Sequence, residues 1–208
     1  MVPVNAWLSV CGDNETPCFR VVDIGSYGRT SDGGTLSHST FCQALVDHTF
    51  QLPEDALLPG AEHLGPQPHV FVADEAFPLG RDLVRPFPGA NLPPRNRVFN
   101  YWLSRARMIV ENTFGILSSQ WRMYHWVIGV SPENMDACVK ATCILHNYVR
   151  RNTRTRREPV PVSEGEVSVL HDLRRVGSNN AAQEAIRVRE IYASYFSAEG
   201  AVPWQPRL

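Results

Sequence analysis

Two carboxylates, Asp74 and Glu111, stand where their chemistry could be used. Asp74 closes a short apolar stretch, HVFVADEAFP (69–78), and Glu111 lies in a strongly patterned segment, SRARMIVENTFGILSSQW (104–121). Hard divalent cations take oxygen ligands, and two ions about 3.5–4 Å apart can activate the attacking and leaving oxygens of phosphoryl transfer. The spacing equally fits a second interpretation, in which Asp74 is a turn residue and Glu111 pairs with Arg107 one helical turn earlier.

Strands and helices alternate in the part of the chain that must position these acids, which favours α/β layering. We expect strands at 5–12, 18–25 and 69–73, a short extended piece at 83–88, and helices at 35–48, about 100–122, 131–151 and 180–198. Ser31 or Asp32 is the expected N-cap of the first helix. For Asp32, we favour a role as helix N-cap over a role as a neighbour of the metal ion.

The two central helices carry apolar stripes of helical period. In the first, the stripe is Leu103, Ala106, Val110, Phe114, Leu117 and Trp121. The second should begin at Ser131 as N-cap with Pro132 at its first position. On that helix Cys138, Ala141, Leu145 and Val149 share one face. We therefore expect its two cysteines, Cys138 and Cys143, in or near the core, although Cys143 and His146 have a zinc-like spacing.

Composition describes a globular chain with an uneven charge distribution. The 208 residues are 43% hydrophobic and carry a net charge of −1. No apolar run approaches the roughly 20 residues that cross a bilayer, so no membrane association is predicted. Residues 1–94 carry −7, residues 95–157 carry +8, and Lys140 is the single lysine. Arginine forks suit phosphate, which favours a polyanionic partner, although a genomic bias toward arginine codons would also produce this composition. The five cysteines without a CxxC pair indicate a reducing, intracellular environment.

Four motifs in order resemble the Harbinger-type DDE transposases and the nuclease-like proteins derived from them. They are VVDIGSYGRTSDGGTLSHSTF (21–41), VADEAFPLGRDLVRPFP (72–88), FNYWLSRARMIVENTFGILSSQWR (99–122) and CVKATCILHNYV (138–149). The resemblance implies a ribonuclease-H-like mixed sheet flanked by helices, with three carboxylates that hold Mg²⁺ or Mn²⁺. By motif match Asp74 is the second Asp of that triad, Glu111 is its Glu, and Arg107 is the basic residue before it.

The resemblance also implies DNA as substrate, a Myb-like DNA-binding protein as partner, and a nuclear location, with the cytoplasm as a second one. Arg105, Arg107 and Arg122 are then expected to face DNA phosphates. The oligomeric state is not indicated. The expected organisation is a partial endonuclease domain (1–151), a linker that changes from basic to acidic (152–178), and a C-terminal helix and tail (179–208).

The chain departs from the family at the first catalytic Asp, which belongs to an Ile-Asp-Gly-Thr-His-like motif. Neither Asp13 nor Asp23 stands in such a motif, so we expect the first core strand to be missing. Two functions follow. One is a metal-dependent endonuclease, expected to be inactive in this form because two metals need three carboxylates. The other is a domesticated, non-catalytic module that binds DNA or protein.

Overall fold

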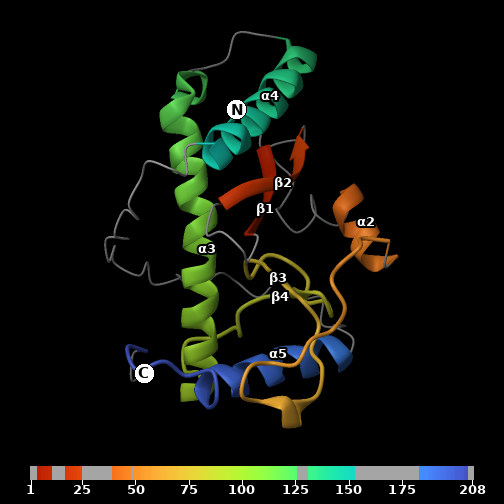
Figure 1. Ribbon diagram of the computed structural model, residues 1–208, viewed down its shortest axis with the longest axis vertical. Coiled ribbons are helices and arrows are strands. Elements are labelled where there is room, and N and C mark those ends of the chain that lie inside the picture. Colours follow the sequence, from red (N-terminus) through yellow and green to blue (C-terminus); the bar gives the residue numbers. More distant parts are fainter. Residues whose placement is uncertain are drawn as a thin grey trace. The chain divides into compact units, whose positions relative to one another are not determined.

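A computed structural model describes residues 4–10, 17–24, 39–47, 49–125, 131–152 and 183–205. Within these ranges the protein is a mixture of helices and two small sheets, which agrees with the predicted α/β class (Figure 1). The ribonuclease-H-like arrangement and the missing first strand stay predictions. The elements are β1 (Val4–Val10), β2 (Pro17–Ile24), α2 (Thr40–Val46), η1 (Glu62–Leu64), β3 (Phe71–Val72), β4 (Leu83–Val84), α3 (Pro94–Gln120), η2 (Arg122–His125), α4 (Pro132–Asn152) and α5 (Gln183–Ser197).

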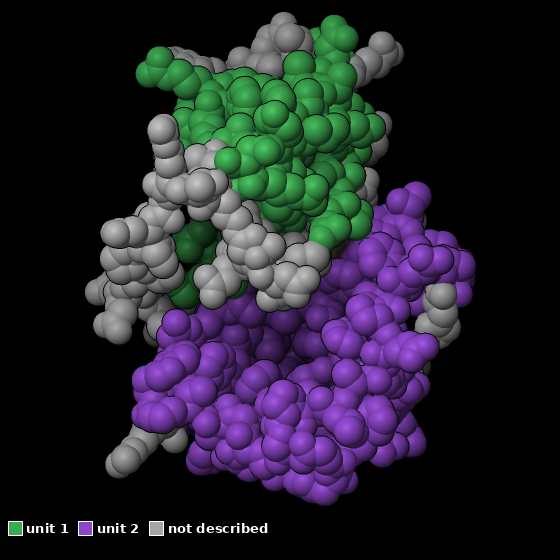
Figure 2. Space-filling view, in the orientation of Figure 1, with its two compact units in different colours: residues 1–31, 108–167 green, residues 32–107, 168–208 purple. Residues whose placement is uncertain are grey.

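The chain divides into two compact units, coloured separately in Figure 2. Unit 1 holds residues 1–31 and 108–167, and unit 2 holds residues 32–107 and 168–208. The division falls inside α3, between Arg107 and Met108. Each unit has its own apolar core, and each is described separately below. The predicted domain boundaries are not tested by this division and stay predictions.

Unit 1 is built on an antiparallel hairpin of β1 and β2, whose register shifts between Trp7 and Leu8. Helix α4 packs on β2. The buried core of this unit consists of Phe19, Leu117, Met135, Val139 and Cys143. Of the two cysteines predicted in or near the core, Cys143 is buried and Cys138 is partly buried.

Asn147 of α4 fastens the helix to β2. Its amide nitrogen donates to the carbonyl of Phe19 at 2.7 Å, and its amide oxygen accepts from the Phe19 N–H at 2.8 Å. In an antiparallel pair, alternate residues turn their backbone groups away from the partner strand. Asn147 satisfies both such groups of Phe19, which would otherwise need water or another strand.

Unit 2 contains the parallel pair β3 and β4, against which α5 packs. Its core consists of Val84, Phe87, Phe99, Leu103, Val188 and Ala193. An asparagine again ties a helix to extended backbone. Asn100 of α3 donates to the Phe87 carbonyl at 2.9 Å and accepts from the Phe87 N–H at 2.8 Å. These contacts hold the first turns of α3 beside the segment that follows β4.

Helix α3 begins at Pro94, six residues before the predicted start at about Asn100. The prolines at positions 88, 93 and 94 favour a loop in the sequence, but a proline at the first helical position loses no hydrogen bond and has a suitable φ. The earlier start brings Val98 and Phe99 into the buried face. Leu103 and Leu117 of the predicted stripe are buried, whereas Ala106 is exposed.

Helix α4 has the predicted bounds to within one residue, but its predicted buried face is wrong. Leu145 and Val149 are exposed, as are Ile144 and Tyr148, with 67% and 65% of their surface accessible. The buried face passes instead through Met135, Val139, Cys143 and His146. Several faces of this helix are apolar, so periodicity alone could not choose between them.

Helix α2 begins after Ser39, whose hydroxyl accepts from the Cys42 N–H at 3.0 Å. The predicted caps Ser31 and Asp32 lie outside the described residues, as does Asp13. The predicted C-terminal helix at 180–198 is confirmed as α5 over its described part. Within the described ranges, no helix is both long enough and apolar enough to traverse a bilayer.

Candidate active site

Asp74 lies two residues after the end of β3, at the start of a turn. The backbone leaves the sheet after Ala73, whose N–H donates to the Val84 carbonyl at 2.8 Å. The turn closes where the Phe77 N–H donates to the Asp74 carbonyl at 3.1 Å. The Asp74 side chain, 36% exposed, thus projects from a fixed strand end.

Arg107 of α3 is the charged partner of Asp74. Its Nη2 lies 2.7 Å from Asp74 Oδ2, while Asp74 Oδ1 accepts from the Glu75 N–H. The Arg107 side chain is 23% exposed, so this is a partly shielded ion pair. Both residues belong to unit 2. Arg107 comes from the helix that Asn100 and the unit 2 core fix in place, which explains why it reaches the end of β3.

Glu111 lies one helical turn after Arg107 on α3 and is exposed. It belongs to unit 1, whereas Asp74 belongs to unit 2. A site shared by the two carboxylates therefore stays a prediction. Asp23, set aside in the sequence as a strand residue, lies in β2 opposite Asn5.

The carboxylate chemistry fits a hard divalent cation only in part. Oxygen donors of the kind that Mg²⁺ prefers are present at Asp74 and Glu111. In this structure, however, both Asp74 oxygens already have protein partners. Over the described part of the chain, no three His, Cys, Asp or Glu side chains form a group that could hold a metal ion. A cation at Asp74 would therefore compete with Arg107 for Oδ2.

The other two predicted DNA-contacting arginines have different surroundings. Arg105 is exposed, bonds to the Tyr101 hydroxyl at 2.9 Å, and lies over the ring of Trp204 at 4.8 Å. Both aromatic rings belong to unit 2. Arg122 opens η2 in unit 1 and is exposed. Contact of these arginines with DNA is not tested and stays a prediction.

Sequence reasoning missed an ion-pair network around Arg81. Its guanidinium pairs with Asp55 at 2.7 Å, Asp82 at 2.6 Å and Glu184 at 3.1 Å. The hydrogen bond to Asp55 is the main cause of a raised Arg81 pKa, which burial opposes. No local pattern marks these residues, because Asp55 and Glu184 are far from Arg81 in the sequence.

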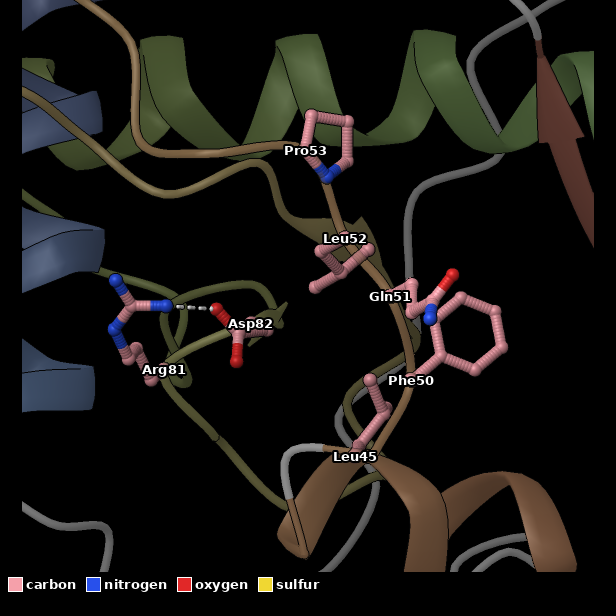
Figure 3. Close-up of a pocket in the computed structure, with 7 residues that line it drawn as sticks. All are labelled: Leu45, Phe50, Gln51, Leu52, Pro53, Arg81 and Asp82. Carbon is pink, nitrogen blue, oxygen red and sulfur yellow. Dashed lines mark hydrogen bonds and ion pairs between the residues drawn. The ribbon is translucent and has the colours of Figure 1, made fainter.

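A cavity of about 230 Å³ opens beside this network (Figure 3). Leu45, Leu52 and Pro53 line it with Arg81 and Asp82, which the figure shows paired with each other. Since three carboxylates already satisfy Arg81, the guanidinium is not available to an anionic ligand. The network is better explained as the support that joins α5 to the loop before β4.

Unit 2 thus pairs an aspartate at the end of a strand with an arginine of α3, in a mixed α/β protein. The model of the DDE superfamily endonuclease family matches residues 6–147, which is more than half of the chain. The chain therefore belongs to the DDE superfamily endonucleases. Asp74, Glu111 and the three predicted arginines all fall within the matched residues. Searches of curated proteins and of solved structures gave no match.

Proposed function

We propose that this chain is a transposase-derived nuclease domain of Harbinger type with a ribonuclease-H-like core. The observation that carries the proposal is the family match over residues 6–147. Endonucleases of this superfamily typically use divalent cations. The order of the motifs around Asp74 and Glu111 supports the finer assignment, as does the position of Asp74 at the end of a strand.

In the proposed mechanism, Asp74 and Glu111 would hold a Mg²⁺ or Mn²⁺ ion. When bound, such an ion supplies Lewis-acid stabilisation of charge on phosphoryl oxygens. The protein's own contribution is to fix the two carboxylates, one on a strand end and one on a helix. Arg105 and Arg122 would hold DNA phosphates, while Arg107 would leave Asp74 Oδ2 when the cation binds.

Two carboxylates are enough for one ion but not for the two-ion arrangement that stabilises both the entering and leaving oxygens. No motif in this sequence assigns the third carboxylate. We therefore expect the 208-residue chain to bind Mn²⁺ weakly and to leave supercoiled plasmid DNA uncut. Cleavage that Glu111→Gln abolishes would contradict this expectation. It would indicate that another carboxylate completes the site, and Asp32 would be the first to test.

A double-mutant cycle on Mn²⁺ affinity tests whether the two acids share an ion. If they do, Asp74→Asn and Glu111→Gln should each weaken binding, and the double variant should lose clearly less than the sum of the two losses. Additive losses would mean that the carboxylates act independently, and the shared site would be wrong. Asp47→Asn, an exposed acid of unit 2 at the end of α2, is a control that should leave affinity unchanged.

A second function, non-catalytic binding of DNA or protein, is favoured by one observation. Asp74 is already neutralised by Arg107, and the described residues contain no group of three metal-ligating side chains. DNA binding that is insensitive to Mg²⁺ and to Asp74→Asn, without cleavage, would support this function. The family resemblance further supports a Myb-like protein partner and a nuclear location as proposals. Co-purification with such a partner and imaging of the tagged chain would test them.

A further inference from the structure

One surface of unit 2 combines cationic and aromatic side chains without a carboxylate among them. Arg97, Tyr101 and Arg105 follow one another at intervals of four along α3, so they lie on the same helical face. Trp204 joins this face from the C-terminal segment. We call these four residues the Arg–Trp face. Over the described ranges, neither Arg97 nor Arg105 has an acidic partner.

The aromatic part of the Arg–Trp face is held in place before any ligand binds. Trp102 stacks on Phe196 of α5, with centroids 5.7 Å apart, and its indole N–H donates to the Gln205 side chain at 3.0 Å. Trp204 then packs edge-on against Trp102 at 5.2 Å. A second hydrogen bond, from the Gln205 N–H to the Val202 carbonyl, closes the turn that contains Trp204. Binding would therefore require little further ordering of these side chains.

The groups that remain available define the ligand. Trp204 is 56% exposed, although burial of its apolar indole surface would be favourable in free energy. The Arg105 guanidinium lies 4.8 Å from the ring centre of Trp204 and 5.8 Å from that of Tyr101, and it donates from one nitrogen to the Tyr101 hydroxyl. Its other N–H groups, with those of Arg97, can donate to an anion. The face thus offers a planar apolar surface beside two cations that have no carboxylate partner among the described residues.

We propose that the Arg–Trp face binds unpaired nucleotides of a single strand, with bases stacking on Trp204 and phosphates contacting Arg97 and Arg105. Aromatic stacking beside a positively charged track is how proteins hold single strands without reading sequence. In a duplex the faces of the bases are already stacked on each other and are not available. The inference rests on the proposed function in taking DNA as the substrate, but it uses none of the metal-binding acids.

The test measures binding of a fluorescent oligothymidylate to the full 208-residue chain in EDTA, so that no divalent cation takes part. Loss of one stacking contact with a base typically weakens binding roughly 5- to 150-fold, which is the decrease expected for Trp204→Ala. Trp204→Tyr should retain most of the affinity. Replacing Arg97 and Arg105 by Gln should reduce the log–log salt slope by about 0.7 each. Leu57→Ala, which removes another exposed apolar side chain of unit 2, is the matched control and should have no effect.

Three further probes distinguish stacking from simple charge attraction. An abasic strand of equal length should bind more weakly than oligothymidylate, and so should the matched duplex. Polyglutamate should not compete. Equal binding of the abasic strand, equal affinity of Trp204→Ala, or competition by polyglutamate would each overturn the proposal. Because these assays contain EDTA, such a failure would leave the proposed metal site untouched. Conversely, loss of Mn²⁺ binding in the acid variants says nothing against the stacking surface.

Discussion

Replacing Arg107 by Gln tests whether the Asp74 carboxylate is a metal ligand, as proposed above. In this structure Arg107 Nη2 lies 2.7 Å from Asp74 Oδ2, so a cation must displace it or share the oxygen. Removing the guanidinium removes the competitor while leaving the carboxylate in place. We therefore expect Arg107→Gln to bind Mn²⁺ more tightly than the wild-type protein.

The size of the effect follows from the exposure of the pair. Unit charges about 4 Å apart attract by roughly 1 kcal/mol in water and about 4 kcal/mol at an effective dielectric constant of 20. The Arg107 and Asp74 side chains are 23% and 36% exposed, so water screens much of this attraction. Exposed pairs typically contribute up to about 1 kcal/mol. Relief of that competition corresponds to a decrease in Kd of up to about fivefold.

Isothermal titration calorimetry with Mn²⁺ at low ionic strength measures this change, and added salt should reduce it. Arg105→Gln is the matched control, because it removes a positive charge from the same helix but breaks no pair with a carboxylate. Equal tightening in both variants would show that net charge, not the Asp74 pair, sets the affinity. Unchanged or weaker binding in Arg107→Gln alone would refute the competition, and Asp74 would have to be reconsidered as a ligand.

Three further predictions concern unit 1. His146 is fully buried, and its pKa is lowered, first by burial and then by Arg150. The unfolded chain therefore binds the proton more readily. The free energy of unfolding therefore keeps its full value above the ordinary histidine pKa of 6.5. It falls as the pH drops below 6.5, by up to about 1.4 kcal/mol per pH unit. The free energy of unfolding of His146→Phe, measured in urea, should not show this pH dependence. An unchanged loss of stability in acid would contradict the assignment to His146. Asn147→Ala removes both hydrogen bonds to Phe19 and should lower the free energy of unfolding by about 1–3 kcal/mol, whereas Asn152→Ala at the exposed end of the same helix should change it little. Burial raises the pKa of the Cys143 thiol to about 11, so in the native protein iodoacetamide should modify Cys138 well before Cys143, as peptide mass spectrometry can measure.

The family assignment came from features that are local in sequence. The apolar period and the Pro132 start predicted α4, and the apolar period predicted α5. The short apolar stretch before Asp74 predicted β3. These signals depend on residues a few positions apart, which a single sequence displays directly. Motif order then led to the DDE superfamily, which the family match over residues 6–147 confirmed.

Which side chains pair with each other, in contrast, was decided by the tertiary structure. Arg107 could pair with Glu111 on its own helix, but the packing of α3 beside β3 and β4 presents it to Asp74, which precedes it by 33 residues. Arg105 likewise contacts the ring of Trp204, which lies near the C-terminus and far from Arg105 in the sequence.

The buried face of α4 could likewise not be predicted from the sequence alone. Its sequence is apolar on more than one side, and contact with β2 selects the side that contains Val139 and His146. Helical period is a property of neighbouring residues, so the sequence by itself determined where helices form and which motifs they carry. Which side chains meet depends on contacts between distant segments, because only folding brings those segments within hydrogen-bonding and van der Waals distance.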